Sequence, residues 1–219
     1  MKIKVVKQLL ELNENFNNDI KEILRRKNVY LVNVMGSPGT GKTSLIIELI
    51  KQLKDKFNIA VVEGDIAGQV DAEKIDSLGI SVIQLNTEGE CHIESKAIYN
   101  ILGYFDLDEI DLIFIENIGN LVCPAEFELG EDFKIAVLSV PEGDDKVEKY
   151  PLLFSKADAI VLNKYDMMEY FEFDDNKVEE NVKELNPLAA TFRISSRTGQ
   201  GLNSFVTYIE EKIKTRIQR

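Results

Sequence analysis

The sequence predicts an α/β fold with a doubly wound, mainly parallel β-sheet that is flanked by helices. Two observations lead to this prediction. From residue 29 onward, short apolar runs alternate with amphipathic stretches, as they do in right-handed β–α–β units. The first apolar run leads into a glycine-rich loop and then an amphipathic helix, which is the strand–loop–helix context of a P-loop NTPase.

The predicted elements follow one another without a linker rich in Pro, Gly or Ser. Apolar residues at roughly helical spacing predict a helical extension over residues 1–27, with a break near residues 13–18, before a P-loop domain over residues 28–219. The apolar runs predict strands over 29–35, 58–63, 80–85, 111–116, 134–140, 158–162 and 190–194. The amphipathic stretches predict helices over 42–56, 71–78, 92–103, 146–156, 175–185 and 202–217. The acidic, aromatic segment 169–176 is expected to be a loop.

Length and charge narrow the class of protein. A chain of 219 residues is long enough for one domain with a full core. The net charge of −12 would repel phosphate backbones, so we expect no nucleic-acid partner. The first 18 residues lack the apolar core of a signal peptide, and no run approaches the ~18 apolar residues of a membrane span. We therefore expect a soluble, cytoplasmic protein without a membrane partner.

The glycine-rich loop matches the motif G-x-x-x-x-G-K-S/T. Its glycines allow backbone N–H groups to face phosphates at the positive end of a helix. Lys42 is expected to reach the β- and γ-phosphates, and the Thr43 hydroxyl is expected to bind Mg²⁺. The expected phosphate-binding residues are Gly36, Ser37, Pro38, Gly39, Thr40, Gly41, Lys42, Thr43 and Ser44.

A second motif indicates which base is bound. The strand over 158–162 runs into Asn163-Lys164-Tyr165-Asp166, the pattern Asn-Lys-x-Asp. A carboxylate at Asp166 can accept hydrogen bonds from guanine N1–H and the 2-amino group, whereas adenine offers neither donor there. Asn163 and Lys164 are expected to brace the loop and flank the base. The segment Ser195-Ser196-Arg197, after the last strand, is expected to close over guanine.

Two acidic residues follow predicted strands on the phosphate side, Asp65 and Glu116. Ligands bind beyond the carboxyl ends of strands in doubly wound sheets, so both are predicted Mg²⁺ ligands and catalytic residues. Gly119 is placed to sense the γ-phosphate through its N–H. No Gln follows it to orient a water, which predicts slow intrinsic hydrolysis. Lys146 and Lys149 are candidates to complete the site of a second subunit, although a solvated helix start is the favoured interpretation of each lysine alone.

The single histidine and both cysteines lie in two short segments, at Cys91-His92 and Cys123. Thiolate and imidazole ligands suit Zn²⁺ or Ni²⁺ rather than Mg²⁺ or Ca²⁺. Three ligands are too few for a closed tetrahedral site, but a two-fold dimer would supply six. The alternative is a pair of structural cysteines beside an incidental histidine.

Together these residues resemble the nickel-incorporation GTPases that assist maturation of nickel–iron hydrogenases. The resemblance runs from Asn28 to the C-terminus. Its most specific parts are Cys91-His92, the segment 114–124 (FIENIGNLVCP), the segment 142–151 (EGDDKVEKYP) and the segment 162–166 (LNKYD). It implies a GTPase fold of the SIMIBI type, GTP and Mg²⁺ as ligands, and GTP-dependent homodimerisation. It also implies nickel or zinc held at the dimer interface by Cys91, His92 and Cys123, and metal release toward the hydrogenase large subunit with a partner maturation factor.

The sequence also departs from this resemblance. The family usually has Gly where this chain has Glu88, and some members carry a cysteine cluster or a histidine-rich tail that is missing here. Ala125 follows Cys123-Pro124, whereas the related urease GTPases have a contiguous Cys-Pro-His. Two alternatives stay open: a GTPase that serves urease or a cobalamin-dependent mutase, and a zinc-binding module with little coupling to GTP. An ATP-dependent P-loop kinase is disfavoured by Asp166.

Overall fold

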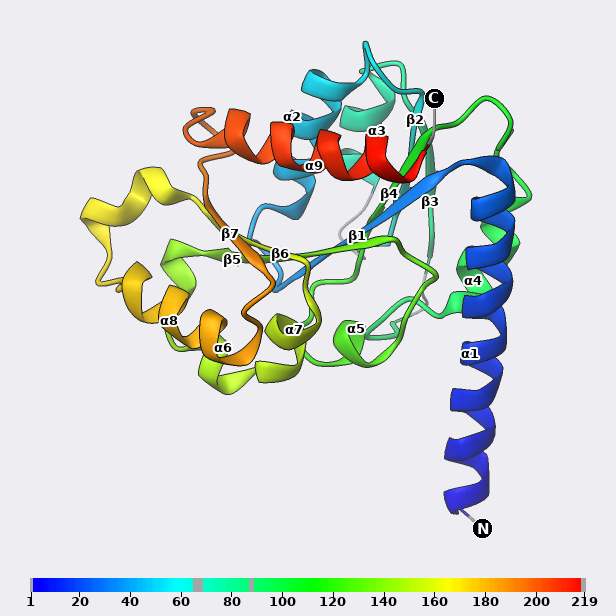
Figure 1. Cartoon of the computed structure of the whole chain (residues 1–219), viewed down its shortest axis with the longest axis horizontal. Coiled ribbons are helices and arrows are strands. Elements are labelled where there is room, and N and C mark those ends of the chain that lie inside the picture. Colours follow the sequence, from blue (N-terminus) through cyan, green and yellow to red (C-terminus); the bar gives the residue numbers. More distant parts are fainter. Residues whose placement is uncertain (1, 65–68, 87–88, 218–219) are drawn as a thin grey trace.

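A seven-stranded parallel sheet forms the centre of the computed structural model, which describes residues 2–64, 69–86 and 89–217, without the side chains of 2–12 and 69–71 (Figure 1). The strand order is β3-β2-β4-β1-β5-β6-β7, and each neighbouring pair is parallel. The strands are β1 (Tyr30–Gly36), β2 (Ile59–Glu63), β3 (Ser81–Gln84), β4 (Leu112–Glu116), β5 (Phe133–Ser139), β6 (Ala159–Asn163) and β7 (Ala190–Arg193). All seven predicted strands are therefore confirmed.

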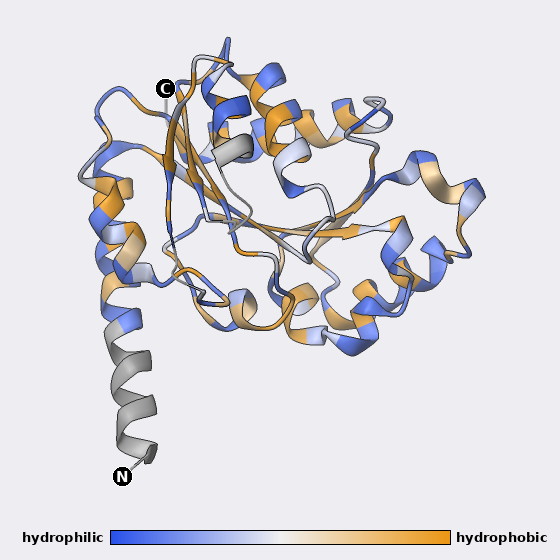
Figure 2. Cartoon of the chain, turned by 180° about the vertical axis from the view of Figure 1, so that it is seen from behind, coloured by the Kyte–Doolittle hydropathy of each residue, from blue (hydrophilic) through white to orange (hydrophobic). Residues whose placement is uncertain are grey.

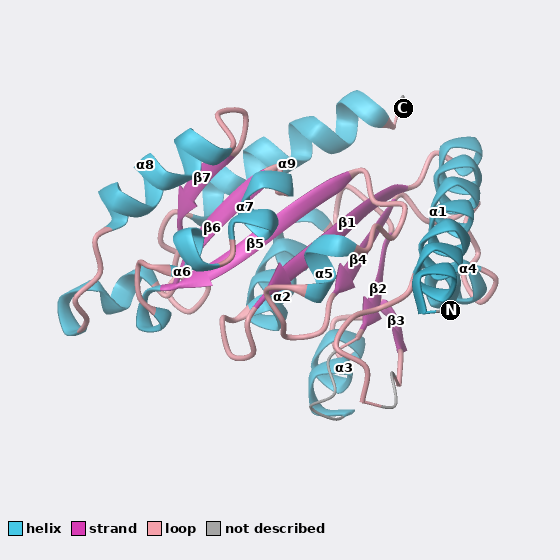
Figure 3. Ribbon diagram, turned by 90° about the horizontal axis from the view of Figure 1, so that it is seen from below, coloured by secondary structure: helices cyan, strands magenta, loops and turns pink. Residues whose placement is uncertain are grey.

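Helices cover both faces of the sheet (Figure 3). One face carries α2 (Lys42–Leu53), α3 (Gln69–Asp76) and α9 (Leu202–Arg216). The other face carries α1 (Lys2–Lys27), α4 (Ser95–Leu102), α5 (Cys123–Glu126), α6 (Lys146–Lys149), α7 (Pro151–Lys156) and α8 (Asp175–Leu185). This arrangement confirms the predicted doubly wound α/β fold. None of the helices in the described ranges is long and apolar enough to cross a membrane.

The hydrophobic core lies in two layers, one on each face of the sheet. Successive residues of β4 alternate between them: Phe114 packs with α2 and α9, and Ile115 packs toward α1 and α4. Both are fully buried, as expected for parallel strands that are covered on both faces. Figure 2 shows the corresponding hydrophobic colour along the strands and on the inward sides of the helices.

The N-terminal helix corrects one prediction. No break occurs near residues 13–18, because α1 is continuous from Lys2 to Lys27. Asn13 and Asn17 do not turn back onto their own backbone but bond to residues outside the helix. The last turns pack into the core, where Ile20 and Leu24 are almost fully buried. The division of the chain at residue 28 stays a prediction.

Other element boundaries also differ from the prediction. The helix predicted over 146–156 is divided into α6 and α7, because Pro151 lacks an N–H and Tyr150 before it is not helical. The segment 169–176 is a loop only in part, since a 3₁₀ helix covers Tyr165–Tyr170 and α8 begins at Asp175. The short helix α5 and a 3₁₀ turn over Val140–Glu142 were not predicted.

Candidate nucleotide and metal sites

The polar residues of the candidate nucleotide site lie where the strands end at one edge of the sheet. Gly36 ends β1, Glu63 ends β2, Glu116 ends β4 and Asn163 ends β6. Parallel strands bring all their carboxyl ends to the same edge, which is where doubly wound folds bind their ligands. The fold thus brings most of the predicted nucleotide residues together.

The loop between β1 and α2 has the geometry of a phosphate cradle. Lys42 opens α2 and is only 2% exposed, and its Nζ donates to the Ser37 carbonyl at 3.3 Å. The amine therefore lies across the loop that is expected to hold the phosphates. Gly41 has φ +93°, and a Cβ there would lie 2.5 Å from the Asn163 Nδ2 atom. Glycine is required at this position both by the backbone conformation and by the neighbouring loop.

Three polar side chains form a candidate Mg²⁺ site beside this loop. The Thr43 hydroxyl donates to Glu116 Oε1 at 2.8 Å, and Glu116 is buried. Glu63 is equally buried and lies beside Glu116 in the register of β2 and β4. Two carboxylates buried side by side favour a cation between them. The hydroxyl and carboxylate oxygens fit Mg²⁺, which takes oxygen ligands and usually one or two carboxylates.

The sequence analysis did not predict Glu63 as a Mg²⁺ ligand. It predicted Asp65, which lies outside the described residues. The signal for Glu63 was its place at the end of a buried strand that neighbours β4. That neighbourhood comes from the strand order, which an apolar pattern does not reveal.

The candidate base site is a cavity of about 580 Å³ between three loops. Its lining includes the predicted residues Gly41, Ser44, Asn163, Lys164, Asp166, Ser196 and Arg197. Ser195 is fully buried behind it, where its hydroxyl accepts from Thr198 N–H at 3.1 Å and shapes the turn. The cavity therefore joins the phosphate loop to both predicted base loops.

Hydrogen bonds lock these loops to one another. Asn163 Nδ2 donates to the Thr40 carbonyl at 2.9 Å, and its Oδ1 accepts from the Ser196 N–H at 3.1 Å. Lys164 donates to the Gly39 carbonyl at 2.6 Å. Asp166 Oδ1 is buried and accepts no hydrogen bond from any described residue. A carboxylate with such a buried acceptor fits the two donors on the guanine edge.

Gly119 packs directly on the phosphate loop. A Cβ at Gly119 would lie 2.7 Å from Pro38 Cγ and 2.8 Å from Pro38 N. The next residue, Asn120, donates its N–H to the Gly36 carbonyl at 3.1 Å. The segment after β4 thus lies against the residues that are expected to hold the nucleotide.

We expect Gly119→Ala to weaken GTP binding by about tenfold or more, because overpacking of this kind costs roughly 1–3 kcal/mol. Isothermal titration with a non-hydrolysable GTP analogue measures the effect. Gly103→Ala is the matched control, since a Cβ there meets only the Asn100 carbonyl at an ordinary 3.5 Å. Equal nucleotide affinities of the two variants would contradict this close contact.

The candidate metal centre is formed by Cys91, His92 and Cys123. Their ligand atoms all lie within 4.8 Å of one another. The two Sγ atoms are 3.0 Å apart, and Cys91 Sγ lies 3.7 Å from His92 Nδ1. Both cysteines are free thiols. Residues 32 positions apart in the sequence are therefore brought to one place, as the metal prediction requires.

The surroundings of these ligands favour a bound cation. The His92 ring stacks on Phe127 at a centroid distance of 3.9 Å, and no described residue is a partner of its buried Nε2. The hydrogen bond with Cys91 is the largest contribution that raises the pKa of the Cys123 thiol, followed by burial. A metal ion would reverse this effect, because it stabilises both thiolates.

One side chain joins the metal ligands to the segment after β4. Asn120 Nδ2 donates to the Cys91 carbonyl at 3.2 Å, and Asn120 Oδ1 accepts from the Val122 N–H at 2.8 Å. Cys123 opens α5 immediately after Val122. Asn120 therefore touches the backbone beside both cysteines, while its own N–H bonds to the end of β1.

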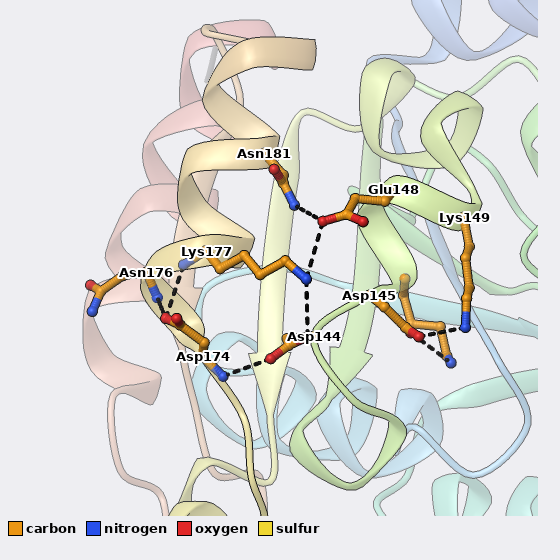
Figure 4. A network of polar contacts seen from close by, with 9 residues as sticks. Asp144, Asp145, Glu148, Lys149, Asp174, Asn176, Lys177 and Asn181 are labelled. Carbon is orange, nitrogen blue, oxygen red and sulfur yellow. Dashed lines mark hydrogen bonds and ion pairs between the residues drawn. The ribbon is translucent and has the colours of Figure 1, made fainter.

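The lysines considered for a second subunit are held by acidic neighbours (Figure 4). Lys146 and Lys149 both pair with Asp145, and the hydrogen bond from Lys149 lowers the pKa of Asp145. Lys177 of α8 pairs with Asp144 at 3.5 Å. The Lys177–Asp144 pair joins the start of α8 to the loop before α6, whereas the pairs of Lys146 and Lys149 are local to α6.

The comparisons with known proteins agree with this geometry. The model of the nucleotide-binding domain of the CobW/HypB/UreG proteins matches residues 30–193. The chain belongs to this family. A probable hydrogenase maturation factor HypB from Methanocaldococcus jannaschii is 40% identical over 212 residues, 97% of this chain and 96% of that protein. The hydrogenase/urease maturation factor HypB of Helicobacter pylori is 40% identical over 223 residues, 99% of this chain and 90% of that protein.

Solved structures of HypB proteins have the same fold. The crystal structure of HypB from Helicobacter pylori in complex with nickel has a TM-score of 0.87 and 38% identity, covering 94% of this chain and 97% of that one. HypB from Archaeoglobus fulgidus has a TM-score of 0.88 and 36% identity, covering 93% and 100%. A LAO/AO transport system kinase shares the fold alone, with a TM-score of 0.56 at 17% identity. The predicted SIMIBI-type P-loop fold is thereby confirmed.

Proposed function

We propose that this member of the HypB group is a GTP-hydrolysing metallochaperone that inserts nickel during maturation of nickel–iron hydrogenases. The observation that carries the proposal is the position of the metal centre. Cys123 follows Gly119 by four residues, and Gly119 packs on the phosphate loop. A nucleotide that moves this segment would therefore move a metal ligand with it.

The nucleotide site supports GTP as the bound nucleotide. Asp166 supplies the buried acceptor for guanine, and Lys42 lies across the loop where the phosphates would bind. Thr43, Glu116 and Glu63 would hold Mg²⁺, with Asp65 as a further ligand predicted from the sequence, and the ion would neutralise charge on the phosphate oxygens. Lys42 would stabilise negative charge that develops on the same oxygens. Hydrolysis is expected to be slow because no glutamine follows Gly119 to orient a water.

The metal centre supports a dimer as the loaded state. One chain offers two thiols and one imidazole, which leaves a tetrahedral or square-planar ion short of ligands. Cys91 is exposed, so its sulfur is accessible to a second copy. We propose that GTP binding joins two copies around the metal, Ni²⁺ or Zn²⁺, and that hydrolysis releases nickel toward the hydrogenase large subunit, with a partner maturation factor.

A nickel titration with Mg²⁺ and either GDP or a non-hydrolysable GTP analogue tests this proposal, with the mass followed by light scattering. We expect the analogue to produce a dimer and to change the nickel affinity. Coupling between two sites typically changes affinity by about 5–150-fold. Equal nickel affinity in both nucleotide states would favour the zinc-binding module with little coupling, since a ligand with no differential affinity shifts no equilibrium. Ala125 after Cys123-Pro124 favours hydrogenase over urease as the client.

Asn120→Ala is expected to reduce the ratio of nickel affinities between the two nucleotide states to about one. The variant keeps all three ligands but loses the hydrogen bonds to the Cys91 carbonyl and the Val122 N–H. The same titration in both nucleotide states measures the ratio. Asn203→Ala, an exposed position on α9, should leave it unchanged. An unaltered ratio in Asn120→Ala would show that coupling does not pass through this side chain.

A further inference from the structure

The two segments that carry the metal ligands are both bonded to the same part of α1. Ser95 comes three residues after His92 at the start of α4, and Glu128 comes five residues after Cys123. Both meet α1 near Asn13. Figure 1 shows α1 and α4 side by side.

Asn13 makes hydrogen bonds to both segments at once. Its Oδ1 accepts from the Ser95 N–H at 3.0 Å and from the Ser95 hydroxyl at 2.7 Å. Its backbone carbonyl accepts from the same hydroxyl at 2.8 Å. Its Nδ2 donates to the Glu128 carbonyl at 3.3 Å. Ser95 is fully buried, so these bonds replace contacts with water that it cannot make.

The next turns of α1 hold the second segment further. Asn17 Nδ2 donates to Glu128 Oε2 at 3.2 Å, and Lys21 Nζ donates to the same oxygen at 3.0 Å. Phe127, the neighbour of Glu128, stacks on His92. The residue that supports the imidazole ring is therefore adjacent to the residue that α1 holds.

Apolar contacts also join α1 to the two ligand-bearing segments. Ile93, directly after His92, is buried in one cluster with Ile20 and Leu24 of α1 and with Leu129. Phe16 of α1 also contacts Tyr99 of α4, with ring centroids 5.3 Å apart. Each ligand-bearing segment is thus attached to α1 by both polar and apolar contacts.

We propose that α1 is a positioning element of the metal centre and that Asn13, Ser95 and Glu128 form a clasp that sets the distance between the two ligand-bearing segments. The proposal rests on the metal-binding function proposed above. A site whose ligands come from two separate segments binds more tightly when a third element holds both in place before the ion arrives. Contacts to these segments also account for Asn13 and Asn17 inside a helix, where the intrinsic propensity of asparagine is poor.

Nickel titration of Asn13→Ala in the full-length protein tests the clasp. Loss of groups that orient metal ligands typically weakens metal binding by roughly 10–100-fold, and we expect a loss in that range. GDP affinity should be unchanged, because the side-chain bonds of Asn13 go to Ser95 and Glu128 and not to the described nucleotide loops. Asn15→Ala and Asn18→Ala are matched controls, since both asparagines are exposed on the same helix. Asn13→Asp keeps the acceptor for Ser95 but loses the donor to Glu128, and should lie between Asn13→Ala and the unaltered chain.

The outcomes distinguish a failure of the clasp from a failure of the proposed metal-binding function. If the unaltered protein takes up no nickel, the proposed function fails and the clasp with it. If it binds nickel and Asn13→Ala binds within twofold of it, only the clasp is overturned. Should Asn13→Ala fail to fold, hydrogen exchange of the unaltered protein decides. Nickel should then slow amide exchange in residues 13–27 of α1, and unchanged exchange there would overturn the clasp.

Discussion

Cys123→Ala is expected to weaken nickel binding by more than about 100-fold, beyond the loss that follows removal of an outer partner of a metal ligand. The Cys123 sulfur lies 3.0 Å from that of Cys91, and its removal leaves one thiol and one imidazole. Two ligands on a single chain hold a transition metal more weakly than three against competition from water and buffer. Competition with a chromogenic chelator measures the affinity.

The control for this variant is the neighbouring position. Val122→Ala changes an exposed side chain, 48% exposed, and leaves all three ligands in place. It should bind nickel as the unaltered protein does, and both variants should keep GDP affinity. If Cys123→Ala and Val122→Ala had the same nickel affinity, Cys123 would not be a nickel ligand.

Asp166→Asn is expected to weaken GTP binding by about 100-fold or more. The Asp166 carboxylate, whose Oδ1 is buried, can accept hydrogen bonds from guanine N1–H and the 2-amino group, and bonds to a charged group contribute roughly 1.5–3 kcal/mol each. An asparagine amide would place a donor against one of these donors. Xanthine carries a carbonyl where guanine has the amino group, so the variant should prefer xanthosine nucleotides. Competitive titration with GTP, ATP and XTP measures the preference.

Glu169→Gln is the matched control for the base site. It neutralises an exposed carboxylate in the same 3₁₀ helix, outside the cavity. It should keep the preference for GTP. An unaltered protein that binds ATP as tightly as GTP would revive the ATP-dependent alternative and contradict the assignment of Asp166.

Most of the sheet could be predicted from the sequence because its strands are covered on both faces. Runs such as Leu112–Ile115 are then continuously apolar. The motif of the glycine-rich loop identifies the strand before it as β1 and the helix after it as α2. The helix boundaries depended more on tertiary contacts. The segment 13–18 predicted a break in α1, but the side chains of Asn13 and Asn17 find partners outside the helix.

For the candidate metal centre, too, the sequence predicts the chemistry of the residues but not which residues are neighbours in space. Cys91, His92 and Cys123 could be predicted from the sequence as ligands of Ni²⁺ or Zn²⁺ from the chemistry of their side chains. That their ligand atoms lie within 4.8 Å of one another depends on how Cys91 and His92 pack against Cys123 at the start of α5. The stacking of Phe127 on His92 carries no sequence signal of its own. The same holds for Glu63, whose place beside Glu116 follows only from the strand order.

The coupling of nucleotide to metal is tested most directly by following phosphate release and nickel transfer in one sample. The protein is loaded with nickel, Mg²⁺ and GTP, and a chromogenic chelator accepts the released metal. The account predicts that nickel reaches the chelator at the rate of phosphate release, and that a non-hydrolysable analogue holds it back. Nickel transfer at one rate with GDP, GTP and the analogue would contradict the account and leave a metal site that is independent of the nucleotide.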